Sequence, residues 1–173
     1  MAGTYEKYRA RNQRNFINSL RGSKPAVRRM AGYFAERGHD VEEPATSESP
    51  RREDWAKHVD RGDLFVNGQR VEVKHWPERT FTCARDFPFK RAMICNKLSW
   101  NRADPKPVAY YIVNAPMTHA AIVLPKTRPH WELKTWVDKR YVGVLDQECY
   151  TVGLEHVIFT ELWGLTDARS AVS

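Results

Sequence analysis

The sequence contains no long hydrophobic run, and this absence excludes the simplest class of membrane proteins. No stretch of roughly 18 or more apolar residues occurs in the 173-residue chain, so we expect no membrane-spanning helix. Residues 1–16 are polar and basic and lack the apolar core of a secretory signal. We therefore expect a cytoplasmic protein with no membrane partner.

Several catalytic and metal-binding motifs are also absent. The three cysteines, Cys83, Cys95 and Cys149, are widely spaced, form no C-x-x-C pair and have no histidines at zinc-ligand spacing. We expect them to be reduced, partly buried thiols. The chain has neither a glycine-rich phosphate loop nor a G-x-S-x-G motif, which argues against NTP-driven chemistry and against a serine hydrolase.

The chain does contain enough apolar residues for a core, together with an excess of positive charge. Hydrophobic residues make up 42% and aromatic residues 12% of the sequence, which favours a folded domain over disorder. Lys and Arg number 28 against 21 Asp and Glu, a formal net charge of +7. Such an excess favours polyanionic partners, of which nucleic acid is the commonest.

The chain divides into three parts. Residues 1–22 form a basic N-terminal helix or arm, residues 23–165 a single domain, and residues 166–173 a frayed tail. The polar segment 45–54 is predicted to be a loop within the domain.

Within the domain, helices and strands alternate. The first helix is predicted to begin at Ser23 as N-cap, with Pro25 in its first turn, and to end at Gly38. This order indicates an α/β fold, a central mixed β-sheet flanked by helices. The predicted strands lie within residues 39–44, 62–66, 69–75, 106–115, 119–124 and 155–163, and the further helices within 89–102 and 128–141.

The segment DRGDLFVNGQRVEVKHW, residues 60–76, predicts a β-hairpin around the turn Asn67-Gly68. Counting outward from the turn places Asp63 opposite Glu72, with Cβ atoms about 4.5–5.5 Å apart. Side chains alternate between the faces of a strand. One face is therefore apolar and is expected to face the core, with Leu64, Val66, Val71 and Val73, while the other carries Asp63, Phe65, Arg70, Glu72 and Lys74.

Two opposed carboxylates repel each other. Lys74, two residues after Glu72, relieves this repulsion in part, and a divalent cation such as Mg²⁺ would relieve it further because hard cations bind carboxylate oxygens. The alternative is an ordinary solvated strand face that carries charges without a ligand.

The pattern Gly62-Asp63 followed by Glu72-Val73-Lys74 resembles the PD-(D/E)XK nuclease superfamily, which has the restriction-endonuclease-like fold. In that family an Asp opens the second core strand and an acidic-x-Lys triplet lies on the third. Gly62 stands where the family usually has proline. The order helix, hairpin, helix, strand is also similar, over roughly residues 23–125.

The resemblance implies a role for each residue of the motif. Asp63, Glu72 and the backbone carbonyl of Val73 would bind Mg²⁺ or Mn²⁺. Lys74 would orient or deprotonate the attacking water, or stabilise the charge that builds on the phosphate.

This sequence departs from the family on the first helix. Many members carry a further Glu there, whereas the corresponding positions are Val27, Arg28 and Arg29. Glu36 is expected to be a solvated residue at the end of that helix, and Asp60 is an alternative ligand that precedes the expected strand. The site is thus expected to have fewer acidic ligands than in many members of the family, or to hold one metal ion.

Basic and aromatic residues near the motif are candidate contacts for nucleic acid. Lys90, Arg91 and Lys97 are predicted on the helix after the hairpin, where the family often places a phosphate contact, and they would form a basic surface with Arg28. The alternative is a solvated charged face. The aromatic residues after Lys74 could stack on bases but are expected to cover the core; they are Trp76, Phe81, Phe87 and Phe89.

The motif geometry, the basic balance and the resemblance together predict a Mg²⁺-dependent endonuclease, with a homodimer as one arrangement for cutting both strands. That it cuts DNA rather than RNA is implied by the resemblance alone. The alternative is a catalytically inactive nuclease fold that binds nucleic acid or a protein. An assembly protein of a virus or mobile element is a third reading.

Overall fold

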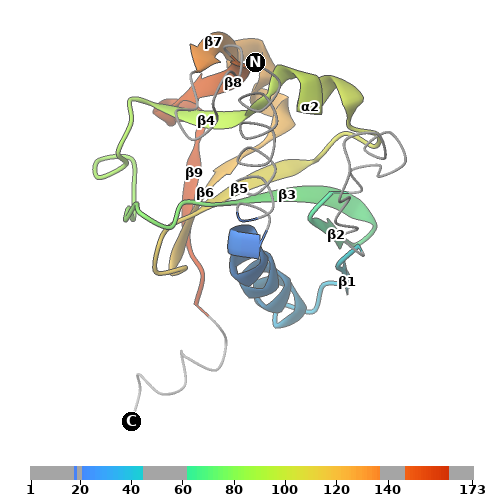
Figure 1. Cartoon of the computed structure of the whole chain (residues 1–173). Helices are drawn as coiled ribbons and strands as arrows, with labels where there is room; N and C mark the ends of the chain where they lie inside the picture. Colours follow the sequence, from blue (N-terminus) through green and yellow to red (C-terminus); the bar gives the residue numbers. More distant parts are fainter. Residues whose placement is uncertain (1–17, 19–20, 45–61, 137–146, 164–173) are drawn as a thin grey trace, which may run out of the picture.

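The computed structural model describes residues 18, 21–44, 62–136 and 147–163, which form an α/β fold with two β-sheets and few helices (Figure 1). Residues 21–35 belong to the N-terminal helix. Later helical segments are α2 (Lys97–Arg102) and two 3₁₀ segments, η2 (Pro125–His130) and η3 (Leu154–His156). The strands are β1 (Val41–Glu42), β2 (Leu64–Val66), β3 (Gln69–His75), β4 (Arg91–Asn96), β5 (Ala109–Val113), β6 (His119–Val123), β7 (Glu132–Trp136), β8 (Gln147–Gly153) and β9 (Ile158–Glu161).

Some predictions fall on residues that the structure does not describe. These are the loop at 45–54, the tail at 166–173, Asp60 and most of the arm at 1–22. Among the described helices, none is long and apolar enough to cross a membrane.

Six strands form the larger sheet, in the order β1-β2-β3-β5-β6-β9. β3 and β5 run parallel, with Glu72 opposite Tyr110, and the other neighbouring strands run antiparallel. Parallel neighbours need a long crossover connection. This crossover contains β4 and α2, and β4 pairs with β8 in a second sheet of order β4-β8-β7.

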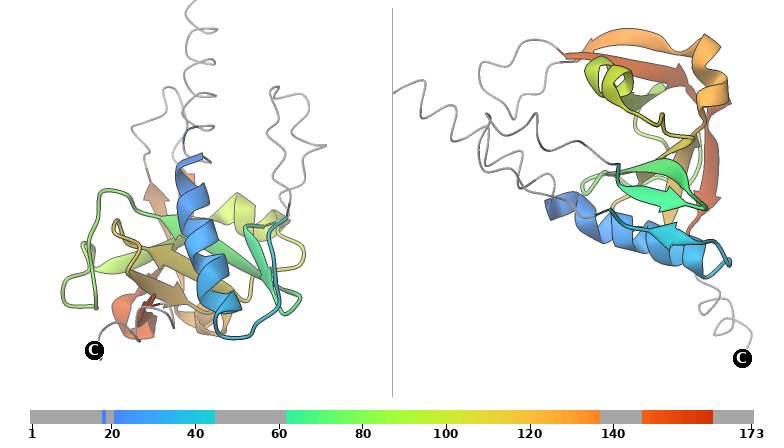
Figure 2. Two further views of the ribbon diagram at one scale, coloured as in Figure 1. Left: turned by 90° about the horizontal axis from the view of Figure 1, so that it is seen from below. Right: turned by 90° about the vertical axis from the view of Figure 1, so that its right-hand side faces the viewer.

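Different elements cover the two faces of the larger sheet (Figure 2). The N-terminal helix packs on one face, where Met30 and Phe34 join the cluster that contains Leu64. The smaller sheet packs on the opposite face, where Ile94 joins the cluster that contains Ile112. Since the sheet is covered on both sides, β5 is mostly buried, as is typical of a parallel strand in an α/β fold.

The predicted hairpin is confirmed, with the predicted register from Val66 opposite Gln69 to Leu64 opposite Val71. Asn67 and Gly68 both have positive φ, 51° and 75°, as a two-residue type I′ turn requires. The apolar face is also confirmed as a core face: Leu64, Val66, Val71 and Val73 are all buried and pack under the N-terminal helix.

The N-terminal helix ends where the sequence predicted but does not begin there. Residues 21 and 22 are already helical, so Ser23 lies inside the helix and is not its N-cap. At the other end, Gly38 has φ +81° and donates to the carbonyl of Ala35, while His39 donates to that of Phe34. These two bonds form a Schellman motif, which a glycine in the left-handed region permits.

Two glycine substitutions, one within this helix and one just beyond its end, are expected to change the free energy of unfolding in opposite directions. Gly38→Ala should lower the free energy of unfolding by about 1–2 kcal/mol, because a Cβ is disfavoured at positive φ. Gly32→Ala should raise it by about 0.5–1 kcal/mol, because alanine is the better helix former and its Cβ would meet no atom within 4 Å. Urea unfolding of both variants tests this pair; equal effects of the two substitutions would contradict the assigned helix end.

Two segments predicted to be helical contain strands instead. Residues 89–102 form β4 and only then the short α2, and the described part of 128–141 forms the end of η2 and then β7. Both strands pair with β8, which the sequence analysis did not predict. In β4, Ala92 and Ile94 are buried at strand spacing, so pairing and burial outweigh the helix preference of the segment.

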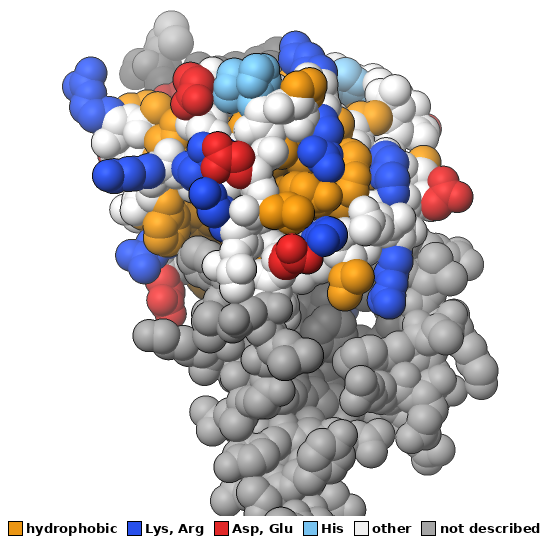
Figure 3. Space-filling view, turned by 90° about the horizontal axis from the view of Figure 1, so that it is seen from above, with side chains coloured by type: hydrophobic (Ala, Val, Ile, Leu, Met, Phe, Trp, Pro, Cys, Tyr) orange, Lys and Arg blue, Asp and Glu red, His pale blue; other side chains and the backbone are white. Residues whose placement is uncertain are grey.

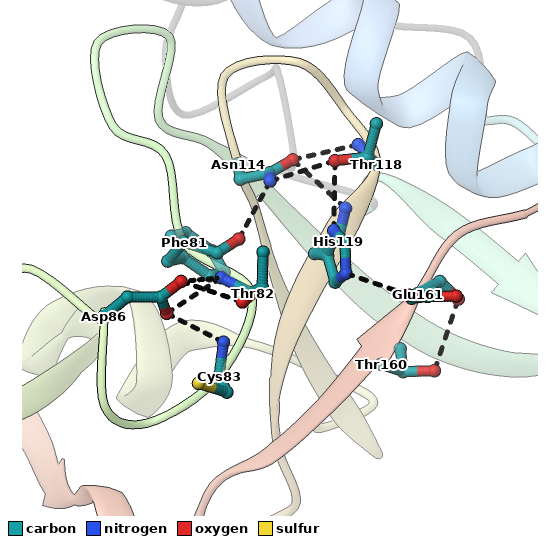
Figure 4. Close-up of polar contacts among 9 residues, drawn as sticks. All are labelled: Phe81, Thr82, Cys83, Asp86, Asn114, Thr118, His119, Thr160 and Glu161. Carbon is teal, nitrogen blue, oxygen red and sulfur yellow. Dashed lines mark hydrogen bonds and ion pairs between the residues drawn. The ribbon is translucent and has the colours of Figure 1, made fainter.

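Polar contacts hold the loop between β3 and β4 (Figure 4). The buried amide of Asn114 donates to the carbonyl of Phe81 and accepts from the N–H groups of Thr118 and His119. The carboxylate of Asp86 accepts from the N–H groups of Cys83 and Thr82 and from the Thr82 hydroxyl. The loop is therefore ordered by side chains rather than by strand pairing.

These contacts give the loop a predicted pH dependence. The backbone N–H groups of Cys83 and Thr82 stabilise the charged form of Asp86 and lower its pKa from 3.8 to about 2. Because the folded pKa is the lower one, the stabilising contribution is complete above pH 3.8 and is lost as the pH falls through about 2. A carboxyl ¹³C NMR titration should find the Asp86 midpoint near 2; a midpoint near 3.8 would contradict the contacts.

Candidate active site

The polar face of the hairpin opens into a pocket between the larger sheet and the segment that joins β4 to β5. The pocket has a volume of about 150 Å³. The prediction that Arg70, Glu72 and Lys74 share one face is confirmed, because all three line this pocket. The complete lining is Arg70, Glu72, Lys74, Cys95, Asn96, Ser99, Ala103, Pro107 and Tyr110.

Glu72 is held by an arginine from its own strand. Arg70 donates to Oε1 of Glu72 from Nε at 2.7 Å, and its Nη2 lies 2.6 Å from the same oxygen. The Arg70 side chain is 2% exposed and that of Glu72 is 19% exposed, so the pair is largely withdrawn from water. The sequence predicts that Lys74 relieves the charge of Glu72 in part, whereas in the structure Arg70 forms the ion pair with Glu72.

Asp63 lies in a bend directly before the first residue of β2. Its Oδ2 accepts a hydrogen bond from the N–H of Val73 at 2.7 Å, in place of a backbone partner on β2. The paired register stops at Leu64, so the predicted strand pair of Asp63 with Glu72 does not form part of the ladder. The N–H and C=O of one strand residue point toward the same neighbour. The carbonyl of Val73 therefore faces the side on which Asp63 lies.

Lys74 differs from the other charged residues of the pocket. Within the described part of the chain its ammonium forms no hydrogen bond or ion pair. It lies close enough to Cys95 and Cys149 to lower the pKa of both thiols, against the stronger effect of their burial. An unengaged ammonium in a partly desolvated pocket can bind an anion without first breaking an existing bond.

Two neutral groups of the pocket, Tyr110 and Cys95, are shifted towards their protonated forms. Burial raises the pKa of Tyr110 well above its ordinary range, and the neighbouring Cys95 and Glu72 add to this effect. Burial likewise raises the pKa of the Cys95 thiol. Both shifts favour the protonated form, and the charged side chains among the lining residues are Arg70, Glu72 and Lys74.

The oxygen donors fit a hard divalent cation in kind. Asp63, Glu72 and the carbonyl of Val73 would supply two carboxylates and one backbone oxygen, the kinds of donor that Mg²⁺ prefers. Of these residues Glu72 lines the pocket, whereas Asp63 is not among the lining residues and contacts the backbone of Val73. Within the described residues, no group of three or more His, Cys, Asp or Glu side chains is arranged to hold a metal ion. Glu36 is exposed in the turn after the N-terminal helix.

The predicted nucleic-acid contacts do not gather on one helix. Lys90 precedes β4 and Arg91 lies on β4, where it pairs with Glu132 at 3.3 Å. Lys97 begins α2 and pairs with Glu148 at 2.7 Å. The prediction of a shared helical face for Lys90 and Lys97 is therefore wrong.

Arg28 lies elsewhere again. It is exposed on the N-terminal helix, which covers the face of the sheet opposite the pocket. Figure 3 shows Lys and Arg side chains distributed around hydrophobic ones rather than gathered in a single stripe. The structure thus does not bring Arg28 together with the pocket residues.

Three of the four aromatic residues after β3 belong to or pack against the core, as expected, and Phe89 does not. Phe81 and Phe87 are 1% and 7% exposed and contact each other at a ring-centroid distance of 5.0 Å. Trp76 packs against both rings, and Phe89 is the most exposed of the four at 39%. The cysteines are free, with Cys95 and Cys149 buried and Cys83 exposed.

Sequence reasoning missed two contributors to the pocket. The alternation of the strand predicts that Arg70 lies on the polar face but predicts neither its burial nor its bond to Glu72. The spacing of two residues on one strand is the signal that indicates this bond. Tyr110 faces the pocket because β5 pairs with β3, with Tyr110 opposite Glu72. No local pattern indicates that pairing.

Comparisons with protein-family models, with curated proteins and with solved structures found no match to this chain.

Proposed function

We propose that the protein is a divalent-cation-dependent nuclease of the PD-(D/E)XK type that hydrolyses phosphodiester bonds in DNA. The observation that carries the proposal is the pairing, in one pocket, of an anchored carboxylate on Glu72 with the ammonium of Lys74, which forms no hydrogen bond or ion pair with the residues that the structure describes. Asp63 lies beside the backbone of the intervening Val73. These are the residues and spacing of the family motif.

The topology supports the same proposal. A helix precedes the antiparallel strands β1, β2 and β3, and a crossover with α2 leads to β5 parallel to β3. This is the order expected of a restriction-endonuclease-like core, to which the sheet β4-β8-β7 is an addition. Strand β3 is central in this arrangement, so its polar residues are held on a rigid element.

Each residue then has a role. A divalent cation bound by Asp63, Glu72 and the Val73 carbonyl would lower the pKa of a coordinated water and offset charge on the phosphate. Lys74 donates to the phosphate oxygens on which negative charge builds during attack. The formal charges of Arg70, Lys74, Glu72 and Asp63 sum to zero, so a bound divalent cation would make the site positive and favour binding of a phosphate.

Cleavage assays test the proposal directly. The wild type is incubated with duplex, single-stranded and branched DNA, and with RNA, in Mg²⁺ or Mn²⁺. We expect DNA cleavage that Asp63→Ala and Glu72→Gln slow by at least about 100-fold, and that Glu78→Gln, a change at an exposed glutamate, leaves unchanged. Equal cleavage by the wild type and Asp63→Ala would overturn the assignment.

A non-catalytic nucleic-acid-binding module is the second candidate. The ion pair of Glu72 with Arg70 favours it, because part of the charge of this ligand is already balanced. Calorimetry separates the two candidates: the nuclease should bind Mn²⁺ in a manner that Glu72→Gln abolishes, whereas the module should bind DNA without any such Mn²⁺ site.

A further inference from the structure

The buried guanidinium of Arg70 lines the pocket, but the proposed function gives it no role. Both of its contacts to Glu72, from Nε and from Nη2, converge on the same oxygen, Oε1. Two donors from one rigid planar group fix the orientation of a carboxylate more firmly than one donor on a flexible chain. At 2% exposure the guanidinium has little room to turn away.

The backbone before Asp63 accommodates this guanidinium. Gly62 has φ +87°, and a Cβ at this position would lie 2.8 Å from Nε and 3.0 Å from Cγ of Arg70. A proline, with φ near −65°, could not adopt this conformation. The glycine that replaces the usual proline of the motif is thus the residue that lets Arg70 lie against the start of β2.

The neighbouring strand closes the site from the other side. Tyr110 lies opposite Glu72 on β5, and its hydroxyl is close enough to Arg70 and Glu72 for both to affect its pKa, in opposite directions. The backbone carbonyl of Arg70 accepts from Val108 at 2.8 Å, which holds the main chain of Arg70 in register. Arg70 is therefore enclosed by Gly62, Glu72 and Tyr110.

We propose that Arg70 is a positioning residue that fixes the Glu72 carboxylate for binding a divalent cation. This inference rests on the proposed function. Arg70 itself would touch neither the cation nor the phosphate, and acts through the carboxylate it holds. Groups that orient a metal ligand in this way typically affect metal affinity by roughly 10- to 100-fold when changed.

The test is Mn²⁺ titration by calorimetry of the wild type and three variants. Arg70→Lys keeps the charge but loses the planar fork, and should weaken Mn²⁺ binding by roughly 10- to 100-fold. Glu72→Gln should abolish it. Arg37→Lys is the matched control, since Arg37 is an exposed arginine whose guanidinium binds the carbonyls of Tyr33 and Trp163, and it should stay within about twofold of the wild type.

A second substitution at Arg70 distinguishes a role in positioning Glu72 from a role in folding alone. Arg70→Ala removes a positive charge, which by itself favours the cation, but it also frees the Glu72 carboxylate from its fixed orientation. If Arg70 acts by positioning, the loss of orientation outweighs the change in charge: Mn²⁺ affinity falls, and millimolar methylguanidinium restores it by filling the vacated site beside Glu72. An Arg70→Ala that binds Mn²⁺ as tightly as the wild type, or more tightly, overturns the proposal. Restoration supports the proposal. A folded Arg70→Ala that methylguanidinium does not restore, or an Arg70→Lys that binds Mn²⁺ as the wild type does, overturns it.

The same titration distinguishes failure of the Arg70 role from failure of the proposed function. Wild-type binding that depends on Glu72 but not on Arg70 overturns the role of Arg70 alone. Wild-type protein with no Glu72-dependent binding overturns the proposed function and this inference together.

Discussion

If the protein is the proposed nuclease, Lys74→Ala should lower the rate of metal-dependent DNA cleavage by about 100- to 1,000-fold, mainly in kcat. The physical reason is the environment of the ammonium. It lines a pocket whose walls include the buried Tyr110 and Cys95, and it forms no hydrogen bond or ion pair with the described residues. A donor in such a site stabilises developing negative charge more than one in bulk water.

The same substitution should leave metal binding intact. Removing a positive charge near the proposed cation site favours the cation, so Mn²⁺ affinity of Lys74→Ala should equal or exceed that of the wild type. Lys126→Ala, at an exposed lysine of η2, is the control and should keep kcat within about twofold. Unchanged kcat in Lys74→Ala would remove Lys74 from the mechanism.

Phe81→Ala lowers the free energy of unfolding by about 3–5 kcal/mol. Phe81 is 1% exposed and makes aromatic contacts with Trp76 and Phe87 of the same loop and with Phe159 of β9. Truncation leaves a cavity between the larger sheet and the loop after β3. The loss is large because the surrounding rings are fixed by several contacts and cannot collapse into the space.

Phe89→Ala is the matched control for this prediction. Phe89 belongs to the same aromatic group but is 39% exposed, and its ring contacts Trp76 and the guanidinium of Arg79. We expect a loss of about 1 kcal/mol or less. Urea unfolding of both variants, with unchanged slopes, measures the difference; equal losses would contradict the core position of Phe81.

The hairpin could be predicted because its signals are local. Asn67-Gly68 determines the turn, and the alternation of Leu64, Val66, Val71 and Val73 determines which face is buried. Both follow from backbone geometry over a dozen residues. The same alternation placed Arg70, Glu72 and Lys74 on one face, which is why the pocket residues of β3 were found from sequence.

The smaller sheet could not be predicted because its stability depends on distant partners. Residues 91–96 have a composition that suits a helix, and they form a strand only because β8 supplies hydrogen bonds from about 55 residues further along the chain. The same dependence explains β7. With β4 misassigned, Lys90 and Lys97 were placed on a common helical face that does not exist.

The burial of Arg70 was also beyond sequence reasoning. A positively charged residue on a polar strand face is normally expected to be solvated. Its 2% exposure results from Gly62, whose missing Cβ leaves room for it, and from the layer that β4 and α2 add above the sheet. Both depend on tertiary structure.

The central claim is that Asp63 and Glu72 hold a divalent cation beside Lys74. The most direct measurement is anomalous scattering from a crystal grown with saturating Mn²⁺. The account predicts a peak coordinated by Asp63, Glu72 and the carbonyl of Val73, and no such peak in Glu72→Gln. A fully occupied Mn²⁺ elsewhere, with none between these two carboxylates, would contradict it.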